Sequence, residues 1–118
     1  MLKTINVTFL TLYCSLIFWL SSQAVLPTPM LFDHQDKIHH MAAYFIMAIL
    51  AWRFFKDYLT KPSTLAIVSI FYCSLYGASD EWHQSFVAGR EADIFDWLAD
   101  TIGALLALVS IYYLKLKR

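Results

Sequence analysis

Long apolar segments separated by short polar stretches make up most of the chain. Four segments meet or approach the ~20 residues that a helix needs to cross a bilayer core: about 5–26, 38–55, 64–84 and 95–114. Unpaired backbone groups are too costly in lipid for open strands, so each segment is predicted to be a helix. Short connections favour antiparallel neighbours. The pattern predicts an all-α fold: a single domain, residues 1–118, forming an integral membrane bundle of four transmembrane helices.

The first apolar segment also has features of a signal peptide. Lys3 would supply its basic start, and the run Ser21-Ser22-Gln23-Ala24 lies where a cleavage site would fall. However, the apolar segment is long for a signal peptide, and Ser21-Ser22-Gln23-Ala24 matches a cleavage site only loosely. We therefore expect a retained span, with cleavage as the alternative.

Basic residues gather at one end of the predicted bundle. The two termini and the connection between the second and third segments carry seven of the nine lysines and arginines: Lys3, Arg53, Lys56, Lys61, Lys115, Lys117 and Arg118. Because basic residues favour the cytoplasmic side, both termini are predicted to be cytoplasmic. This pattern indicates a multi-pass protein of the cytoplasmic (inner) membrane.

Composition agrees with a membrane protein and places the acids at the other end. The chain is 59% hydrophobic, above the ~45–50% of soluble domains. Its zero formal net charge gives no reason to expect a nucleic-acid partner. Eight of the nine acids fall on the predicted outer side, where the only basic residues are Lys37 and Arg90: Asp33, Asp36, Asp80, Glu81, Glu91, Asp93, Asp96 and Asp100.

The spacing of these polar residues predicts a shared cavity. Residues three or four apart lie on one helix face, and three sets recur in this way: Asp36, His40 and Tyr44; Glu81 and Gln84; Asp93, Asp96 and Asp100. Ionisable groups at membrane depth almost always face a bundle interior or a wet cavity. Separate capping and rim roles are the alternative, which explains Asp36 or Asp93 but not Asp100 and Glu81 together.

We therefore predict one acidic cavity that opens outward, with Lys37 and Arg90 as the cations that compensate its acids. Its candidate binding residues are Asp36, Lys37, His40, Tyr44, Asp80, Glu81, Gln84, Arg90, Asp93, Asp96 and Asp100.

Two segments carry a family pattern. DKIHHMAAY, residues 36–44, has the form DK-x-x-H-x-x-x-Y, and SDEWHQSFVAGREADIFDWLADTIG, residues 79–103, contains DE-x-x-Q-x-F-x-x-GR-x-x-D-x-x-D. In this order and spacing the chain resembles the VanZ-like membrane protein family, and its hydropathy extends the likeness over nearly the whole chain. Two positions depart from the family pattern: Ala88 replaces a common proline, and Asp100 replaces a common asparagine.

The resemblance implies a multi-pass membrane protein with an outward polar site and a role in the cell envelope. The family's namesake is linked to low-level resistance to the glycopeptide teicoplanin, which acts on cell-wall precursors. The resemblance does not imply a particular reaction.

Four classes of function fit these residues. In the favoured one, a binding or accessory protein, the acidic cavity engages a cationic or envelope-derived ligand or a membrane protein partner. A cation-coupled carrier would need to dimerise, because four spans are few for a transporter. A structural clasp of acids and bases with no ligand is the third class.

The fourth class is a membrane-embedded enzyme acting on an envelope or lipid-linked substrate. Glu81 or His40 would be its general base, and Arg90 with Lys37 would hold an anionic group. An acidic cavity repels phosphate unless a divalent cation offsets it. No motif requires a metal, but Asp36, Glu81, Asp93 and Asp96 are the candidate ligands. Such oxygens favour magnesium, calcium or manganese, and a histidine would add zinc.

Overall fold

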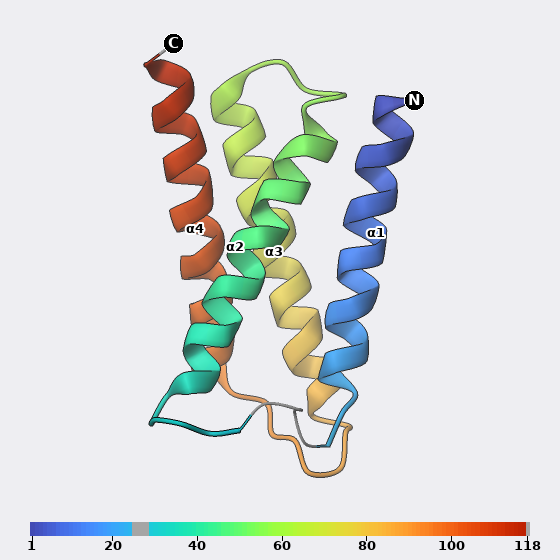
Figure 1. Ribbon diagram of the computed structural model, residues 1–118, viewed down its shortest axis with the longest axis vertical. Helices are drawn as coiled ribbons and strands as arrows, with labels where there is room; N and C mark the ends of the chain where they lie inside the picture. Colours follow the sequence, from blue (N-terminus) through green and yellow to red (C-terminus); the bar gives the residue numbers. More distant parts are fainter. Residues whose placement is uncertain (25–28, 118) are drawn as a thin grey trace.

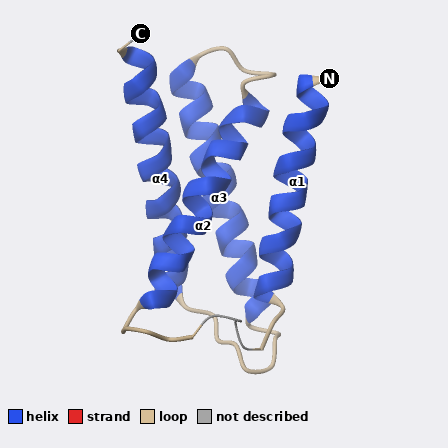
Figure 2. Ribbon diagram, viewed as in Figure 1, coloured by secondary structure: helices blue, strands red, loops and turns tan. Residues whose placement is uncertain are grey.

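The computed structural model describes residues 1–24 and 29–117. Within them the fold is a bundle of four helices with no strand: α1 (Leu2–Ser21), α2 (Gln35–Phe55), α3 (Pro62–Gln84) and α4 (Ile94–Leu116). Successive helices run in opposite directions, so both chain termini lie at the same end of the bundle (Figures 1 and 2). The all-helical prediction is therefore confirmed.

Three of the four helices in the described ranges are long and apolar enough to cross a membrane: α1, α2 and α4. The third helix, α3, has the length of a span, with a proline in its first turn. Its last turns, however, carry the polar run from Ser79 to Gln84, which lowers its mean hydropathy. The sequence predicted four membrane spans, and three of the four helices have the length and composition of a membrane span.

The helix ends differ from the predicted ends at two places that matter. The first helix was predicted over 5–26, but it ends at Ser21, and residues 25–26 lie outside the described ranges. Side chains just beyond it bond the last carbonyls: Ser22 Oγ donates to Phe18 O over 2.9 Å. The second helix begins at Gln35, three residues before the predicted start, so Asp36 and Lys37 belong to its first turn.

The closest helix packing joins α2 to α4. A Cβ atom built on Gly103 would lie 2.8 Å from Met41 Cα and 2.9 Å from Met41 C, which are backbone atoms of α2. Buried alanines on the same two helices keep the approach close farther along: Ala48, Ala51, Ala104 and Ala107. Small residues allow helix backbones to approach in membranes, so this contact sets the position of α2 relative to α4.

The second helix crosses the bundle obliquely. It lies near α1 at the end with the chain termini and near α4 at the opposite end (Figure 1). At the first end, Asn6 Nδ2 donates to Arg53 O over 2.9 Å. Farther along, Tyr13 Oη donates to Ala43 O over 2.5 Å. Beyond Ala43 the two helices diverge, and the polar residues of the predicted site lie at this open end.

Candidate functional site

Lys37 is the centre of a group of acids at the start of α2 and α4. Its Nζ lies 2.8 Å from Asp36 Oδ2, 2.8 Å from Asp93 Oδ2 and 2.6 Å from Asp96 Oδ1. Asp93 is also the N-cap of α4, because its Oδ1 accepts a hydrogen bond from Phe95 N. The hydrogen bond from Lys37 holds the pKa of Asp93 below its ordinary value of 3.8. Three acids therefore share one cation.

The next acid along α4 meets a histidine instead. His40 Nδ1 lies 2.6 Å from Asp100 Oδ1, and His40 Nε2 lies 3.8 Å from Asp96 Oδ2. The Asp100 side chain has no exposed surface. A carboxylate bonded to one ring nitrogen of a histidine orients the ring and favours the proton on that nitrogen. Asp100 therefore holds His40 in place from the bundle interior.

Glu81 completes this inner group from α3. Its Oε2 accepts a hydrogen bond from Asp93 N over 3.0 Å. One ligand atom each from His40, Glu81 and Asp100 lie within 4.8 Å of one another. Two buried oxygens of this triad, Glu81 Oε1 and Asp100 Oδ2, have no hydrogen-bond partner. The His40–Glu81–Asp100 triad therefore brings together donor types that bind metal ions, and it is a candidate metal site.

Gly77 makes room for the buried acid of the triad. A Cβ atom at this position would lie 2.9 Å from Asp100 Oδ2 and 3.2 Å from Asp100 Cβ. A glycine one residue before an apolar-to-polar transition is a weak signal in a sequence. Its role follows only from the pairing of α3 with α4.

The triad differs from the ligand set considered from the sequence. Of those four residues, Glu81 belongs to the triad, whereas the other three surround Lys37: Asp36, Asp93 and Asp96. The spacing places Asp93, Asp96 and Asp100 on one face of α4, but it does not say which cation each acid meets. That assignment depends on the position of α2.

Arg90 has a different partner from the one expected. Its Nη1 donates to Gln23 O over 3.1 Å and to Leu20 O over 3.4 Å, and within the described ranges it forms no ion pair with a carboxylate. The last carbonyls of a helix lack partners within the helix, and arginine is a good donor to them. Arg90 therefore ties the loop before α4 to the end of α1, whereas Lys37 forms the ion pairs with Asp36, Asp93 and Asp96.

The remaining predicted residues line one cavity with Arg90: Asp80 and Gln84 of α3, and Tyr44 of α2. Asp80 accepts a hydrogen bond from Ser21 Oγ, and Gln84 Nε2 donates to the same oxygen over 3.4 Å. Tyr44 is buried, and its hydroxyl has no partner. Ser21 could not be identified as a site residue from the sequence, because a serine at the end of an apolar segment usually marks only the end of the helix.

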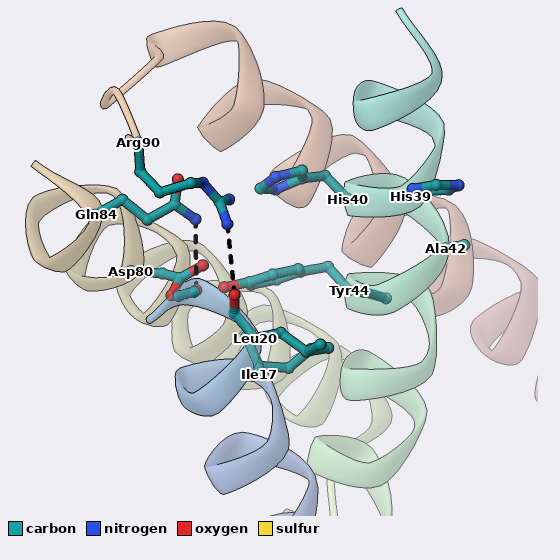
Figure 3. A pocket seen from close by; sticks show the side chains of 11 residues that line it. Ile17, Leu20, His39, His40, Ala42, Tyr44, Asp80, Gln84 and Arg90 are labelled. Atoms are coloured by element: carbon teal, nitrogen blue, oxygen red, sulfur yellow. Dashed lines mark hydrogen bonds between the residues drawn. The ribbon is translucent and has the colours of Figure 1, made fainter. Parts of the chain in front are cut away.

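Two adjoining cavities join these groups. One, of about 710 Å³, is lined by the three acids around Lys37, by Glu91 and, from the triad, by His40. The other, of about 330 Å³, lies deeper and is lined mainly by apolar surface (Figure 3). Both are lined by His39, His40, Gln84 and Arg90. The polar residues therefore lie where a charged cavity meets an apolar one.

A bundle of long apolar helices with ionisable residues at one end defines a polytopic membrane protein. Comparison with known proteins identifies its kind: residues 3–116 match the VanZ/LLP1 family, and the chain belongs to that family. It is 30% identical over 99 residues to an uncharacterized protein of Schizosaccharomyces pombe. The match covers 82% of this chain and 57% of that protein, so the chain spans little more than half of its relative's length. No solved structure matches the chain.

Proposed function

We propose that this chain is a membrane-embedded hydrolase that depends on a divalent cation and acts on an anionic envelope or lipid-linked substrate. The carrying observation is the His40–Glu81–Asp100 triad with its two buried, unpartnered carboxylate oxygens. Buried carboxylate oxygens without partners are costly, and a cation removes that cost. Ionisable residues at membrane depth are costly and typically mark functional sites.

The donor set indicates which cations to expect. One imidazole nitrogen with carboxylate oxygens suits zinc or manganese, whereas an all-oxygen set would favour magnesium or calcium. Two ionised carboxylates and one divalent cation carry no net charge together. An anionic substrate group then meets no repulsion from the triad, and this removes the main objection to an enzyme.

Each residue has a role in this scheme. The cation would polarise a water molecule and supply the hydroxide for hydrolysis. Arg90 lines both cavities, and its guanidinium supplies positive charge for the substrate's anionic group. Lys37 is already surrounded by three carboxylates, so we assign it the structural role of holding α2 to α4.

The same contacts weigh against the binding role favoured from the sequence. That role needs an acidic cavity with charge to spare for a cationic ligand. Three of the acids lie within 2.8 Å of Lys37, which neutralises one of their three charges and occupies one oxygen of each carboxylate, so fewer carboxylate oxygens are free to bind a cationic ligand. The hydrolase scheme requires neither the homodimer nor the membrane protein partner considered from the sequence.

We further propose that the site faces the outer side of the cytoplasmic membrane. The support is the distribution of lysine and arginine, which favours the end of the bundle opposite the site. A site on that side faces cell-wall precursors, so the proposed envelope role extends to the teicoplanin resistance that the family resemblance implies.

Thermal unfolding in detergent tests the cation dependence. Zinc, manganese, magnesium and calcium are each added after EDTA treatment, and metal content is measured by mass spectrometry. A cation that binds only the folded state stabilises it by about 2.7 kcal/mol at a hundredfold excess over its Kd. We expect zinc or manganese to raise the Tm of the wild type but not of Glu81→Gln.

Glu91→Gln is the matched control, because Glu91 is exposed at the rim and lies outside the triad. It should keep the full shift. A wild type that no cation stabilises, or an equal shift in Glu81→Gln, would reject the proposal.

A further inference from the structure

The deeper cavity lies between α1 and α2, where the two helices diverge. Ile17 and Leu20 of α1 form one wall, Ala43 and Tyr44 of α2 form the other, and α3 lies behind them (Figure 3). Two contacts mark its ends. Toward the chain termini, Tyr13 Oη bonds Ala43 O; toward the loops, Arg90 bonds the carbonyls of Leu20 and Gln23.

The cavity reaches the side of the bundle. Ala42 lines it and is exposed, and Leu20 is only half-buried. On α2, Ile38 and Ile46 lie one turn to either side of Ala42 and are also exposed. In a membrane this apolar surface faces hydrocarbon, so the cavity opens toward the lipid.

The inner part of the same cavity is polar. His40, Gln84 and Arg90 line it and also line the charged cavity next to it. In Figure 3 Arg90 and His40 approach each other from opposite sides, with Tyr44 below them. Asp80 also lines this cavity, where its carboxylate accepts a hydrogen bond from Ser21 Oγ. An occupant is therefore apolar where it meets Ile17 and Ala43, and an anionic end is drawn to Arg90 and away from Asp80.

We infer that this cavity holds the hydrocarbon chain of a membrane lipid whose anionic head group lies beside Arg90 and His40. The volume of about 330 Å³ is at the lower end of the ~300–1,000 Å³ of small-molecule sites, so it takes part of one chain and not a whole lipid. Lipid enters sideways between α1 and α2. Its binding does not require the cation, but its role as substrate rests on the proposed function.

Lipid binding to the purified protein in neutral detergent tests this inference. The probes are dioleoyl phosphatidic acid, dioleoyl phosphatidylcholine and glycerol 3-phosphate, with affinity measured from the shift in Tm. Phosphatidic acid should bind the wild type most tightly. Glycerol 3-phosphate has the head group without the chains and should produce no shift at the same concentration.

Two variants fill the cavity: Ala42→Phe at its exposed edge and Ala43→Phe inside it. Each should lower the affinity for phosphatidic acid at least about tenfold, which corresponds to ~1.4 kcal/mol of binding free energy from lost apolar contact. Ala78→Phe is the matched control, because Ala78 is an exposed alanine of α3 outside the cavity. Arg90→Gln keeps a donor for the α1 carbonyls and should lower phosphatidic acid affinity to that of phosphatidylcholine.

Unchanged phosphatidic acid affinity in the folded Ala42→Phe protein, or equal binding of glycerol 3-phosphate, would overturn the inference. The stabilisation by zinc or manganese is measured on the same variants and should persist in Ala42→Phe. If no cation stabilises the wild type while lipid binding follows the expected pattern, the hydrolase is rejected and the chain-binding cavity is supported.

Discussion

His40 Nδ1 lies 2.6 Å from Oδ1 of a completely buried Asp100, and this contact links α2 to α4 in the interior of the bundle. The other carboxylate oxygen of Asp100 has no partner. A buried acid with one satisfied and one unsatisfied oxygen costs stability unless a ligand completes it.

Asp100→Ala should therefore destabilise the protein. Removing one member of a buried pair leaves the other uncompensated, at a cost of about 3 kcal/mol. Asp100→Asn keeps an acceptor for His40 and should cost within about 1 kcal/mol while still abolishing cation binding. Unfolding in mixed micelles measures both variants against Asp33→Asn, an exposed loop control. Full cation binding by Asp100→Asn would remove Asp100 from the triad.

Gly77→Ala should act through the same carboxylate. The added methyl group would lie 2.9 Å from Asp100 Oδ2, so the acid must shift, at a cost of about 1–3 kcal/mol. A double-mutant cycle with Asp100→Ala should show coupling of about 1 kcal/mol or more, because the smaller side chain removes the closest contact, to Oδ2, and leaves Cβ at 3.2 Å. Additive effects of the two substitutions would show that Gly77 does not act through Asp100.

Gly103→Ala provides the contrast. Its methyl group would meet the backbone of Met41, which no side-chain substitution relieves. Asp100→Ala should therefore give no rescue there. The comparison separates a glycine that makes room for a side chain from one that allows two helices to touch.

Much of the architecture could be predicted from hydropathy, because apolar length and charge asymmetry are local properties. Of the three acids that helical spacing grouped, Asp96 and Asp100 are buried residues of α4, and Asp93 is its extended N-cap. Their partners could not be predicted, because the contact of Gly103 with Met41 decides how far α2 is shifted along α4. Lys37 consequently meets two of these acids and His40 meets the third.

Arg90 shows a second limit of sequence reasoning. Charge alone suggested an acidic partner, but Arg90 follows Gly89, whose φ of 82° turns the loop toward the end of α1. Unpaired helix carbonyls are invisible in a sequence until the helix end is known, and α1 ends several residues before the apolar pattern does.

The Lys37 group predicts a pH dependence of stability. Lys37 lowers the pKa of Asp93 below 3.8, so the ionised form of Asp93 is favoured by folding. A depressed folded-state pKa stabilises the protein above the unfolded-state value, and this contribution is lost as the pH falls through the folded value. The unfolding free energies of wild type and Asp93→Asn should therefore converge below about pH 4.

Asn is also a good N-cap, so Asp93→Asn keeps the start of α4 intact. Lys37→Met should reverse the slope of the unfolding free energy against pH. Three acids that lose their shared cation repel one another until they are protonated, so this variant should become more stable as the pH falls. Unfolding in detergent from pH 7 to pH 3 measures all three proteins. Parallel curves for wild type and Asp93→Asn would mean that Lys37 does not hold the acid in its ionised form.

The orientation of the bundle decides which compartment reaches the site, and single cysteines can measure it. Cys14 and Cys73 are free, so both are first replaced by serine or alanine. A cysteine is then placed at Glu91, beside the charged cavity, or at Lys117, at the other end of the bundle. The distribution of basic residues predicts that an impermeant maleimide labels the first in intact cells and the second only after permeabilisation. Labelling of position 117 in intact cells would show that the protein has the opposite orientation. The triad would then face cytoplasmic substrates instead of envelope precursors.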